Sequence, residues 1–158
     1  MQHDWLCHDA GCYPPASGLT VWLASKRGGG SEMRVYVVDD SALVRERLVA
    51  LLLEVPGVDV VGTAESAEEA IAGIAMLRPD VAILDIRMPS GSGISVLEEV
   101  KKKEDAPIVM MLTNYPYPQY RKKCMDAGAD YFFDKSSEFH KVTDVLARMI
   151  AGEAKPDP

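Results

Sequence analysis

The stretch Val35-Tyr36-Val37-Val38-Asp39-Asp40 decides the fold of this chain, because four apolar residues run without a break into two adjacent carboxylates. A strand with one solvated face alternates apolar and polar residues, whereas a strand buried on both faces is apolar throughout. Three further apolar runs lead to polar residues in the same way: 81–84 before Asp85, 108–112 before Thr113, and 131–133 shortly before Lys135. These runs predict a parallel sheet covered by helices on both faces.

The polar residues that follow these runs predict a site for phosphoryl chemistry. The carboxyl ends of parallel strands lie along one sheet edge, so Asp39, Asp40, Asp85, Thr113 and Lys135 should meet there. Three clustered carboxylates repel one another unless a hard cation such as Mg²⁺ joins them. Mg²⁺ usually takes only one or two protein carboxylates, which leaves Asp85 as the nucleophile we favour. Lys135 and Thr113 would complete the site by contacting phosphoryl oxygens.

The chain is organised as one domain with extensions. Strands and amphipathic helices alternate from Met33 as five βα units, and we place the domain at 33–152 with a polar tail at 153–158. Residues 1–32 contain Pro14-Pro15 and a glycine-rich stretch and lack sustained periodicity. We expect this leader to be a flexible extension, a cloning remnant or an upstream misreading of the start.

Bulk properties narrow the classes of function. A chain of 158 residues suits one domain plus extras, and a net charge of −7 argues against general nucleic-acid binding. No stretch approaches the roughly 20 apolar residues of a membrane span, and the start lacks a secretory signal, so the predicted location is cytoplasmic. Three cysteines indicate no disulfide framework.

The leader holds ligand types that could bind zinc. These are His3, Cys7, His8 and Cys12. Their spacing matches no common structural zinc site, so zinc binding is the less favoured interpretation.

Three segments together carry a resemblance to a known family. They are Val-Tyr-Val-Val-Asp-Asp (35–40), Ile-Leu-Asp-Ile-Arg-Met-Pro (83–89) with Gly93 beyond it, and Ala-Gly-Ala-Asp-Tyr-Phe-Phe-Asp-Lys (127–135). Their order and spacing resemble the receiver domain of bacterial two-component response regulators, in its single-domain, CheY-like form, from residue 33 to about 151. The resemblance implies an α/β, flavodoxin-like, doubly wound (βα)5 fold with five parallel strands in the order 2-1-3-4-5.

The resemblance also implies roles for individual residues. Asp85 would be the phosphoacceptor and a metal ligand. Asp40 would bind Mg²⁺ directly, Asp39 through water, and Arg87 through its backbone carbonyl. Lys135 would pair with a phosphoryl oxygen.

The implied output is a conformational switch that a partner protein reads. Thr113 and Phe132 occupy the positions of the family's switch residues. The candidate partner face comprises Gln119, Tyr120, Lys122 and Lys123. The phosphodonor would be a sensor histidine kinase or a histidine phosphotransfer protein, and homodimerisation is a further alternative. Such a chain is no enzyme beyond its own phosphorylation and dephosphorylation, and it binds neither nucleic acid nor membrane directly.

The sequence departs from the family pattern at two places and carries large residues at two positions where the family tunes the hydrolysis of the aspartyl phosphate. Asn114 stands where a very small residue is usual, and Ser136 follows Lys135 where proline is common. Arg87 and Tyr115 flank the site, and we predict that their bulk slows hydrolysis of the aspartyl phosphate.

Alternative functions stay open. The chain could instead be a phosphorelay intermediate or a phosphate sink. A phosphohydrolase of the haloacid dehalogenase type is disfavoured, because such enzymes carry Asp-x-Asp after the first strand and residue 41 here is serine. A flavodoxin-like cofactor site is disfavoured as well, because no Ser/Thr/Gly phosphate loop follows that strand.

Overall fold

The structure is a computed structural model that describes residues 6–8, 11–13 and 32–152. A short antiparallel hairpin, which the sequence did not predict, pairs β1 (Leu6–His8) with β2 (Gly11–Tyr13). The other leader residues and the tail 153–158 lie outside the described part, so the predictions for them stay untested. The same holds for the zinc hypothesis, because none of its four side chains is described.

Residues 32–152 form the five βα units expected from the sequence. The strands are β3 (Met33–Val38), β4 (Val58–Ala64), β5 (Val81–Leu84), β6 (Ile108–Thr113) and β7 (Tyr131–Asp134). The helices are α2 (Ala42–Leu53), α3 (Ala67–Leu77), α4 (Gly93–Lys101), α5 (Pro118–Asp126) and α6 (Lys141–Ile150). None of the helices in the described ranges is long and apolar enough to cross a membrane.

The sheet has the topology that the resemblance implied. Its strands are all parallel in the order β4-β3-β5-β6-β7, which is 2-1-3-4-5 within the five units. The ends of the central strands are in register, because Val38 lies opposite Leu84 and Leu84 lies opposite Met111. The residues that follow β3, β5 and β6 therefore emerge side by side at one edge.

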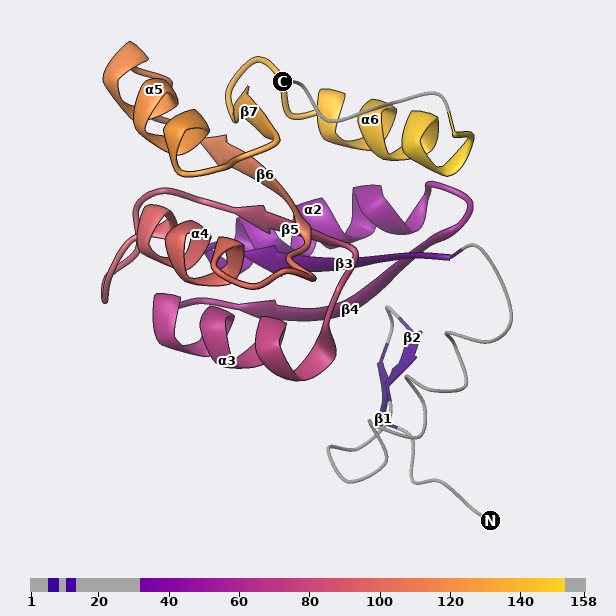
Figure 1. The fold of residues 1–158 in the computed structure, drawn as a ribbon. Helices are drawn as coiled ribbons and strands as arrows, with labels where there is room; N and C mark the ends of the chain where they lie inside the picture. Colours follow the sequence, from indigo (N-terminus) through magenta and orange to yellow (C-terminus); the bar gives the residue numbers. More distant parts are fainter. Residues whose placement is uncertain (1–5, 9–10, 14–31, 153–158) are drawn as a thin grey trace.

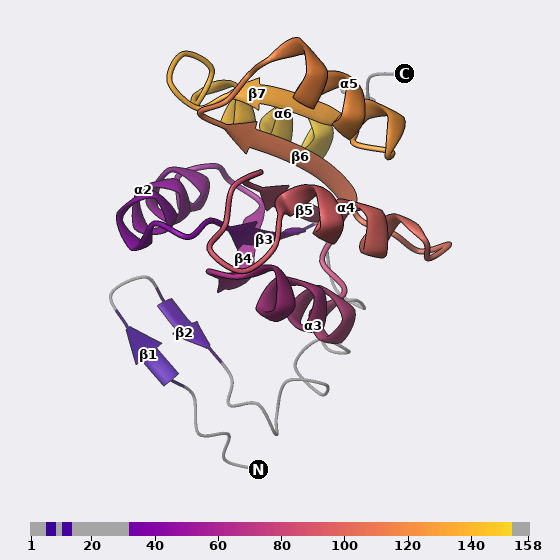
Figure 2. The ribbon, with the colours of Figure 1, turned by 90° about the vertical axis from the view of Figure 1, so that its left-hand side faces the viewer.

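Helices cover both faces of the sheet, as Figures 1 and 2 show. Helices α2 and α6 bury one set of strand residues, which includes Val35, Val37 and Ile83. Helices α3, α4 and α5 bury the alternate set, which includes Val38, Leu84 and Phe132. Burial on both faces explains why the strands carry no alternation of apolar and polar residues.

Serine caps start two of the helices beside the strand ends that carry the acidic residues. The Ser41 hydroxyl accepts a hydrogen bond from the backbone N–H of Val44 at the start of α2, and the Ser92 hydroxyl accepts one from Ile94 at the start of α4. Such caps satisfy N–H groups that have no partner within the helix. They fix where the loops after β3 and β5 end.

Candidate functional site

Three carboxylates meet at the carboxyl edge of the sheet. Asp39 and Asp40 follow β3, Asp85 follows β5, and each offers an oxygen within 4.8 Å of the others. Asp39 and Asp85 are buried, with 3% and 7% of their surfaces exposed, whereas Asp40 is exposed. The sequence predicted this convergence, and the structure places all three residues together.

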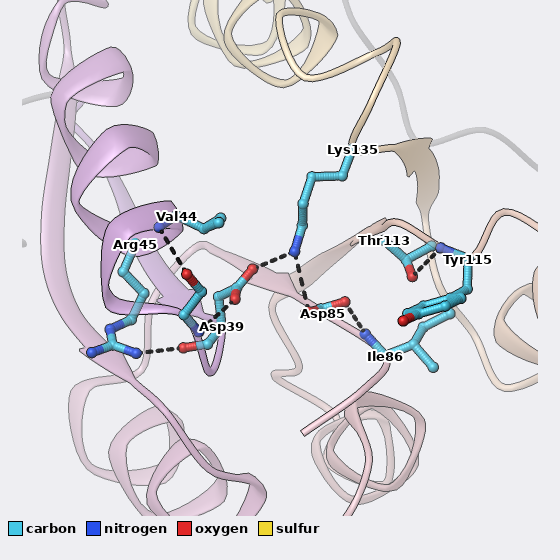
Figure 3. Close-up of polar contacts among 9 residues, drawn as sticks. Asp39, Val44, Arg45, Asp85, Ile86, Thr113, Tyr115 and Lys135 are labelled. Atoms are coloured by element: carbon cyan, nitrogen blue, oxygen red, sulfur yellow. Dashed lines mark hydrogen bonds and ion pairs between the residues drawn. The ribbon is translucent and has the colours of Figure 1, made fainter. Parts of the chain in front are cut away.

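Lys135, directly after the edge strand β7, extends its side chain to the cluster (Figure 3). Its Nζ lies 2.5 Å from Asp39 Oδ2 and 3.1 Å from Asp85 Oδ2, and its side chain is only 8% exposed. Burial opposes the ammonium charge, but the two carboxylates outweigh it and raise the pKa of Lys135. The lysine therefore stays charged and offsets part of the negative charge of the cluster.

Asp85 is held at both carboxylate oxygens. Oδ1 accepts a 2.8 Å hydrogen bond from the backbone N–H of Ile86, while Oδ2 faces Lys135. Burial raises the pKa of Asp85 and the charge of Asp39 adds to this effect, against the opposing influence of Lys135. Asp85 is thus a fixed, poorly solvated carboxylate, as an oxygen nucleophile should be.

The acidic pair is anchored by α2. Asp39 Oδ1 accepts a hydrogen bond from the Ser41 N–H at 2.9 Å. Arg45, one turn into α2, donates from its guanidinium to the backbone carbonyl of Asp39 at 2.7 Å. No pattern in the sequence predicted a role for Arg45. Its spacing of six residues from Asp39 carries no general signal, because the bond depends on the path of the loop.

Gly93 lets α4 approach the acceptor loop closely. A Cβ atom at this position would stand 1.8 Å from the backbone oxygen of Asp85, far inside any allowed contact. The Gly93 N–H also donates to the carbonyl of Ile86 at 2.9 Å. Any side chain here would displace the backbone that carries the acceptor.

Thr113 and Tyr115 border the other side of the site. Thr113 is fully buried, and its hydroxyl oxygen accepts a hydrogen bond from the Tyr115 N–H at 3.0 Å (Figure 3). The guanidinium of Arg87, from the loop after β5, lies 4.2 Å from the centre of the Tyr115 ring. This pair joins the loop after β5 to the loop after β6, next to Thr113.

The two predicted switch residues lie on neighbouring strands. Phe132 is on β7 beside Met111 of β6, two residues before Thr113. Its ring is buried, with 6% exposed, and the guanidinium of Arg121 on α5 lies 5.5 Å from the ring centre. The ring therefore connects the sheet edge to α5.

The predicted partner face is a surface of α5. Gln119, Lys122 and Lys123 are exposed, and Lys122 pairs with Asp126 at 2.8 Å. Tyr120 is half-buried and packs against the core, so only part of its ring is accessible.

The donor set of the site suits a small divalent cation. All three acidic residues offer hard carboxylate oxygens, two of them fixed by hydrogen bonds, which is the chemistry that Mg²⁺ prefers. The expected contribution of the Arg87 backbone carbonyl stays a prediction.

Comparison with known proteins gives consistent matches. The sequence model of one protein family, the response regulator receiver domain, matches residues 35–147. A protein-glutamate methylesterase/protein-glutamine glutaminase of Carboxydothermus hydrogenoformans is 35% identical over 122 residues, which make up 76% of this chain and 36% of the relative. The chain thus spans about a third of that relative, and it covers 60% of a Bacillus subtilis transcriptional regulatory protein, YvfU.

Solved structures show the same likeness. The response regulator domain of Thermotoga maritima CheB superposes with a TM-score of 0.69 at 32% identity, covering 80% of this chain and 99% of that one. CheY in a CheX–CheY complex with BeF3⁻ and Mg²⁺ from Borrelia burgdorferi superposes with a TM-score of 0.67 at 28% identity, covering 78% and 90%.

Proposed function

Because this chain belongs to the family of response regulator receiver domains, a family of signalling domains, we propose that it accepts a phosphoryl group on Asp85 and signals through protein contacts. The observation that carries the proposal is the buried Asp85 carboxylate, which lies beside Asp39 and Asp40 and is contacted by the Lys135 ammonium. The proposed phosphodonor is the phosphohistidine of a sensor histidine kinase or of a histidine phosphotransfer protein.

The residues of the site divide the chemistry among them. An Asp85 oxygen attacks phosphorus while the bond from phosphorus to the donor nitrogen breaks. The Ile86 N–H keeps the carboxylate oriented, and the Lys135 ammonium compensates charge on the phosphoryl oxygens. Asp39, Asp40, Asp85 and the Arg87 carbonyl would hold Mg²⁺, which supplies further charge neutralisation at the phosphoryl group.

The proposed switch uses Thr113 and Phe132. The Thr113 hydroxyl accepts from the Tyr115 N–H, so its own proton is available to a phosphoryl oxygen once the side chain turns. That movement would break the hydrogen bond from the Tyr115 N–H and vacate space on the side of the neighbouring strand, which carries Phe132. A shift of the Phe132 ring would then change the packing of α5. The exposed residues Gln119, Lys122 and Lys123, with Tyr120 beside them, are the surface that a partner would read.

The CheX–CheY complex supports protein partners for this family, since the relative is seen there bound to another protein. A homodimer, a role as a relay intermediate and a role as a phosphate sink remain alternatives that the lifetime of the aspartyl phosphate and the oligomeric state would separate. The expected cytoplasmic location stays a prediction. Catalytic activities of longer relatives belong to those proteins, since this chain aligns with only part of them.

Intact-protein mass spectrometry tests the proposal. The wild type and Asp85→Asn are incubated with acetyl phosphate, with and without Mg²⁺. One Mg²⁺-dependent phosphoryl adduct that disappears in Asp85→Asn is expected. An adduct that survives in Asp85→Asn, or none in the wild type with a small donor or a histidine phosphotransfer protein, would contradict the proposal. Turnover of free phosphate esters would instead favour the phosphohydrolase alternative.

A further inference from the structure

The turn that follows β7 is held by side chains on both sides of Lys135. Asp134 Oδ1 accepts hydrogen bonds from the backbone N–H and the hydroxyl of Ser136, at 2.9 and 2.7 Å. Glu138 Oε2 accepts the Asp134 N–H at 2.9 Å, and the Glu138 N–H donates to the Asp134 carbonyl at 2.7 Å. Asp134, Ser136 and Glu138 form what we call the 134–138 brace, and Lys135 lies within it.

The brace fixes the starting point of a long side chain. The Lys135 N–H donates to the Thr113 carbonyl at 2.8 Å, so the backbone is tied to β6 on one side and to the brace on the other. From there the side chain runs into the buried cluster and ends between Asp39 and Asp85. A lysine side chain has several rotatable bonds and loses conformational entropy when the ammonium is held between two carboxylates, and a fixed backbone limits how much more must be ordered.

The two carboxylates of the brace remain hydrogen-bond acceptors at neutral pH. Hydrogen bonds from Ser136, first its hydroxyl and then its N–H, lower the pKa of Asp134. Contact with Lys141, at 2.7 Å, and the Asp134 N–H lower the pKa of Glu138. Both groups therefore stay ionised near neutral pH and keep their acceptor character. Neither carboxylate is bonded to Asp39 or Asp85, whereas Lys135, the residue between Asp134 and Ser136, contacts both of them.

We propose that Glu138, with Asp134 and Ser136, is a positioning residue for Lys135: it holds the lysine backbone where the ammonium reaches both acidic side chains. This inference rests on the proposed function of Asp85. It assigns to this turn a part in phosphoryl transfer and not only in the stability of a surface loop.

The test compares Glu138→Ala with two matched variants. Glu138→Ala removes the acceptor for the Asp134 N–H, Glu138→Gln keeps an oxygen acceptor, and Lys141→Ala removes only the outer ion pair. We expect Glu138→Ala to slow phosphorylation by acetyl phosphate roughly three- to tenfold, as the loss of one hydrogen bond allows. Glu138→Gln should retain most of the rate, and Lys141→Ala should match the wild type.

Calorimetric titration with Mg²⁺ alone supplies a readout that loop stability would not move. If the ammonium leaves the acidic cluster, the cluster becomes more negative, so Glu138→Ala should bind Mg²⁺ more tightly while it is phosphorylated more slowly. Lys135→Ala removes the ammonium altogether, so it should show the largest gain in Mg²⁺ affinity and the largest loss of phosphorylation rate. In the Lys135→Ala background, Glu138→Ala should change neither quantity further.

The outcomes separate the two hypotheses. Equal rates and equal Mg²⁺ affinities in Glu138→Ala and the wild type would overturn the positioning role. An effect of the same size with and without Lys135 would overturn it as well. A wild type that binds Mg²⁺ but is never phosphorylated would overturn the proposed function, while the Mg²⁺ titration would still decide whether the brace positions Lys135.

Discussion

At the scale of single residues, Asp85 carries a charge in a place where that charge is costly. Burial raises its pKa, so the folded protein binds this proton more tightly than the unfolded chain does. Protonated Asp85 contributes to the free energy of unfolding in acid, below the pKa of an ordinary aspartate. This contribution is lost as the pH rises through the raised pKa of the folded protein. In the absence of Mg²⁺, the Asp85 carboxylate therefore destabilises the fold at neutral pH.

Asp85→Asn should thus stabilise the metal-free protein near neutral pH, and the gain should shrink in acid. Urea denaturation of both proteins with a chelator, at about pH 7 and about pH 4, measures the difference. A stabilisation of equal size at both pH values, or a loss of stability near pH 7, would contradict the view that the buried Asp85 charge destabilises the metal-free protein. Asp40→Asn is the control, because that carboxylate is exposed.

The Arg87–Tyr115 pair should slow the loss of the phosphoryl group from Asp85. The guanidinium over the ring joins the loops after β5 and β6 next to Thr113, and the bulk of this pair should hinder water from reaching the aspartyl phosphate. Replacing both residues with alanine should speed loss of the phosphoryl group by up to about tenfold, equivalent to about 1.4 kcal/mol on the barrier. The decay of the phosphorylated mass gives the rate, with Met76→Ala, an exposed residue of α3, as control. A rate that stays the same or falls would refute the idea.

At the scale of elements, the contact of α4 with the acceptor loop depends on Gly93. In Gly93→Ala, the new methyl group must push α4 away from the Asp85 backbone oxygen. We expect a loss of about 1–3 kcal/mol in the free energy of unfolding, together with much slower phosphorylation. Urea denaturation and the adduct assay measure the two effects.

Gly73→Ala separates local from general effects. Gly73 lies in α3, where the three atoms nearest to an added Cβ would all belong to the Tyr36 side chain and none to the acidic cluster. This variant should also be destabilised, yet its folded fraction should be phosphorylated at the normal rate. If both glycine variants lose phosphorylation in proportion to stability, Gly93 has no special role at the acceptor.

The helices and strands were largely predictable, because buried apolar residues recur along each element at a fixed spacing. In α3, Ala70, Ile74 and Leu77 recur at the three- and four-residue spacing of one helix face, and all three are buried. The strand order came from the resemblance alone, because periodicity within one element says nothing about its neighbours in the sheet. In α2 only Leu48 and Leu52 are fully buried, while Val49 packs against the same core and stays partly exposed.

The acidic cluster was predictable for a different reason: parallel strands bring their carboxyl ends to one edge, so three distant aspartates had to meet. The contacts of Arg45 and Glu138 were not predictable in this way. They join side chains to the backbone of irregular loops, and such bonds follow no period. The Asp134-Lys135-Ser136 triplet did hold one local signal, because aspartate commonly accepts from the N–H two residues ahead.

At the scale of the whole molecule, the acidic edge and α5 are joined by few parts. Thr113 ends β6, Phe132 is on the adjacent β7, and Arg121 of α5 covers the Phe132 ring. Phosphorylation can shift α5 only by as much as it stabilises one arrangement over the other. A buried reporter on α5 would reveal such a shift without knowledge of the partner.

Cys124 is that reporter. Its side chain is fully buried on α5 beside the core that contains Phe132, and burial raises the pKa of its thiol to about 11. At about pH 8 only about a thousandth of such a thiol is ionised, so a thiol reagent should modify it slowly. With Cys7 and Cys12 replaced by serine, we expect beryllofluoride and Mg²⁺ to accelerate labelling of Cys124, and Asp85→Asn to abolish the acceleration. Because labelling requires both access to the thiol and its ionisation, an unchanged rate would mean that α5 keeps its packing and that the signal leaves the acidic edge by another surface.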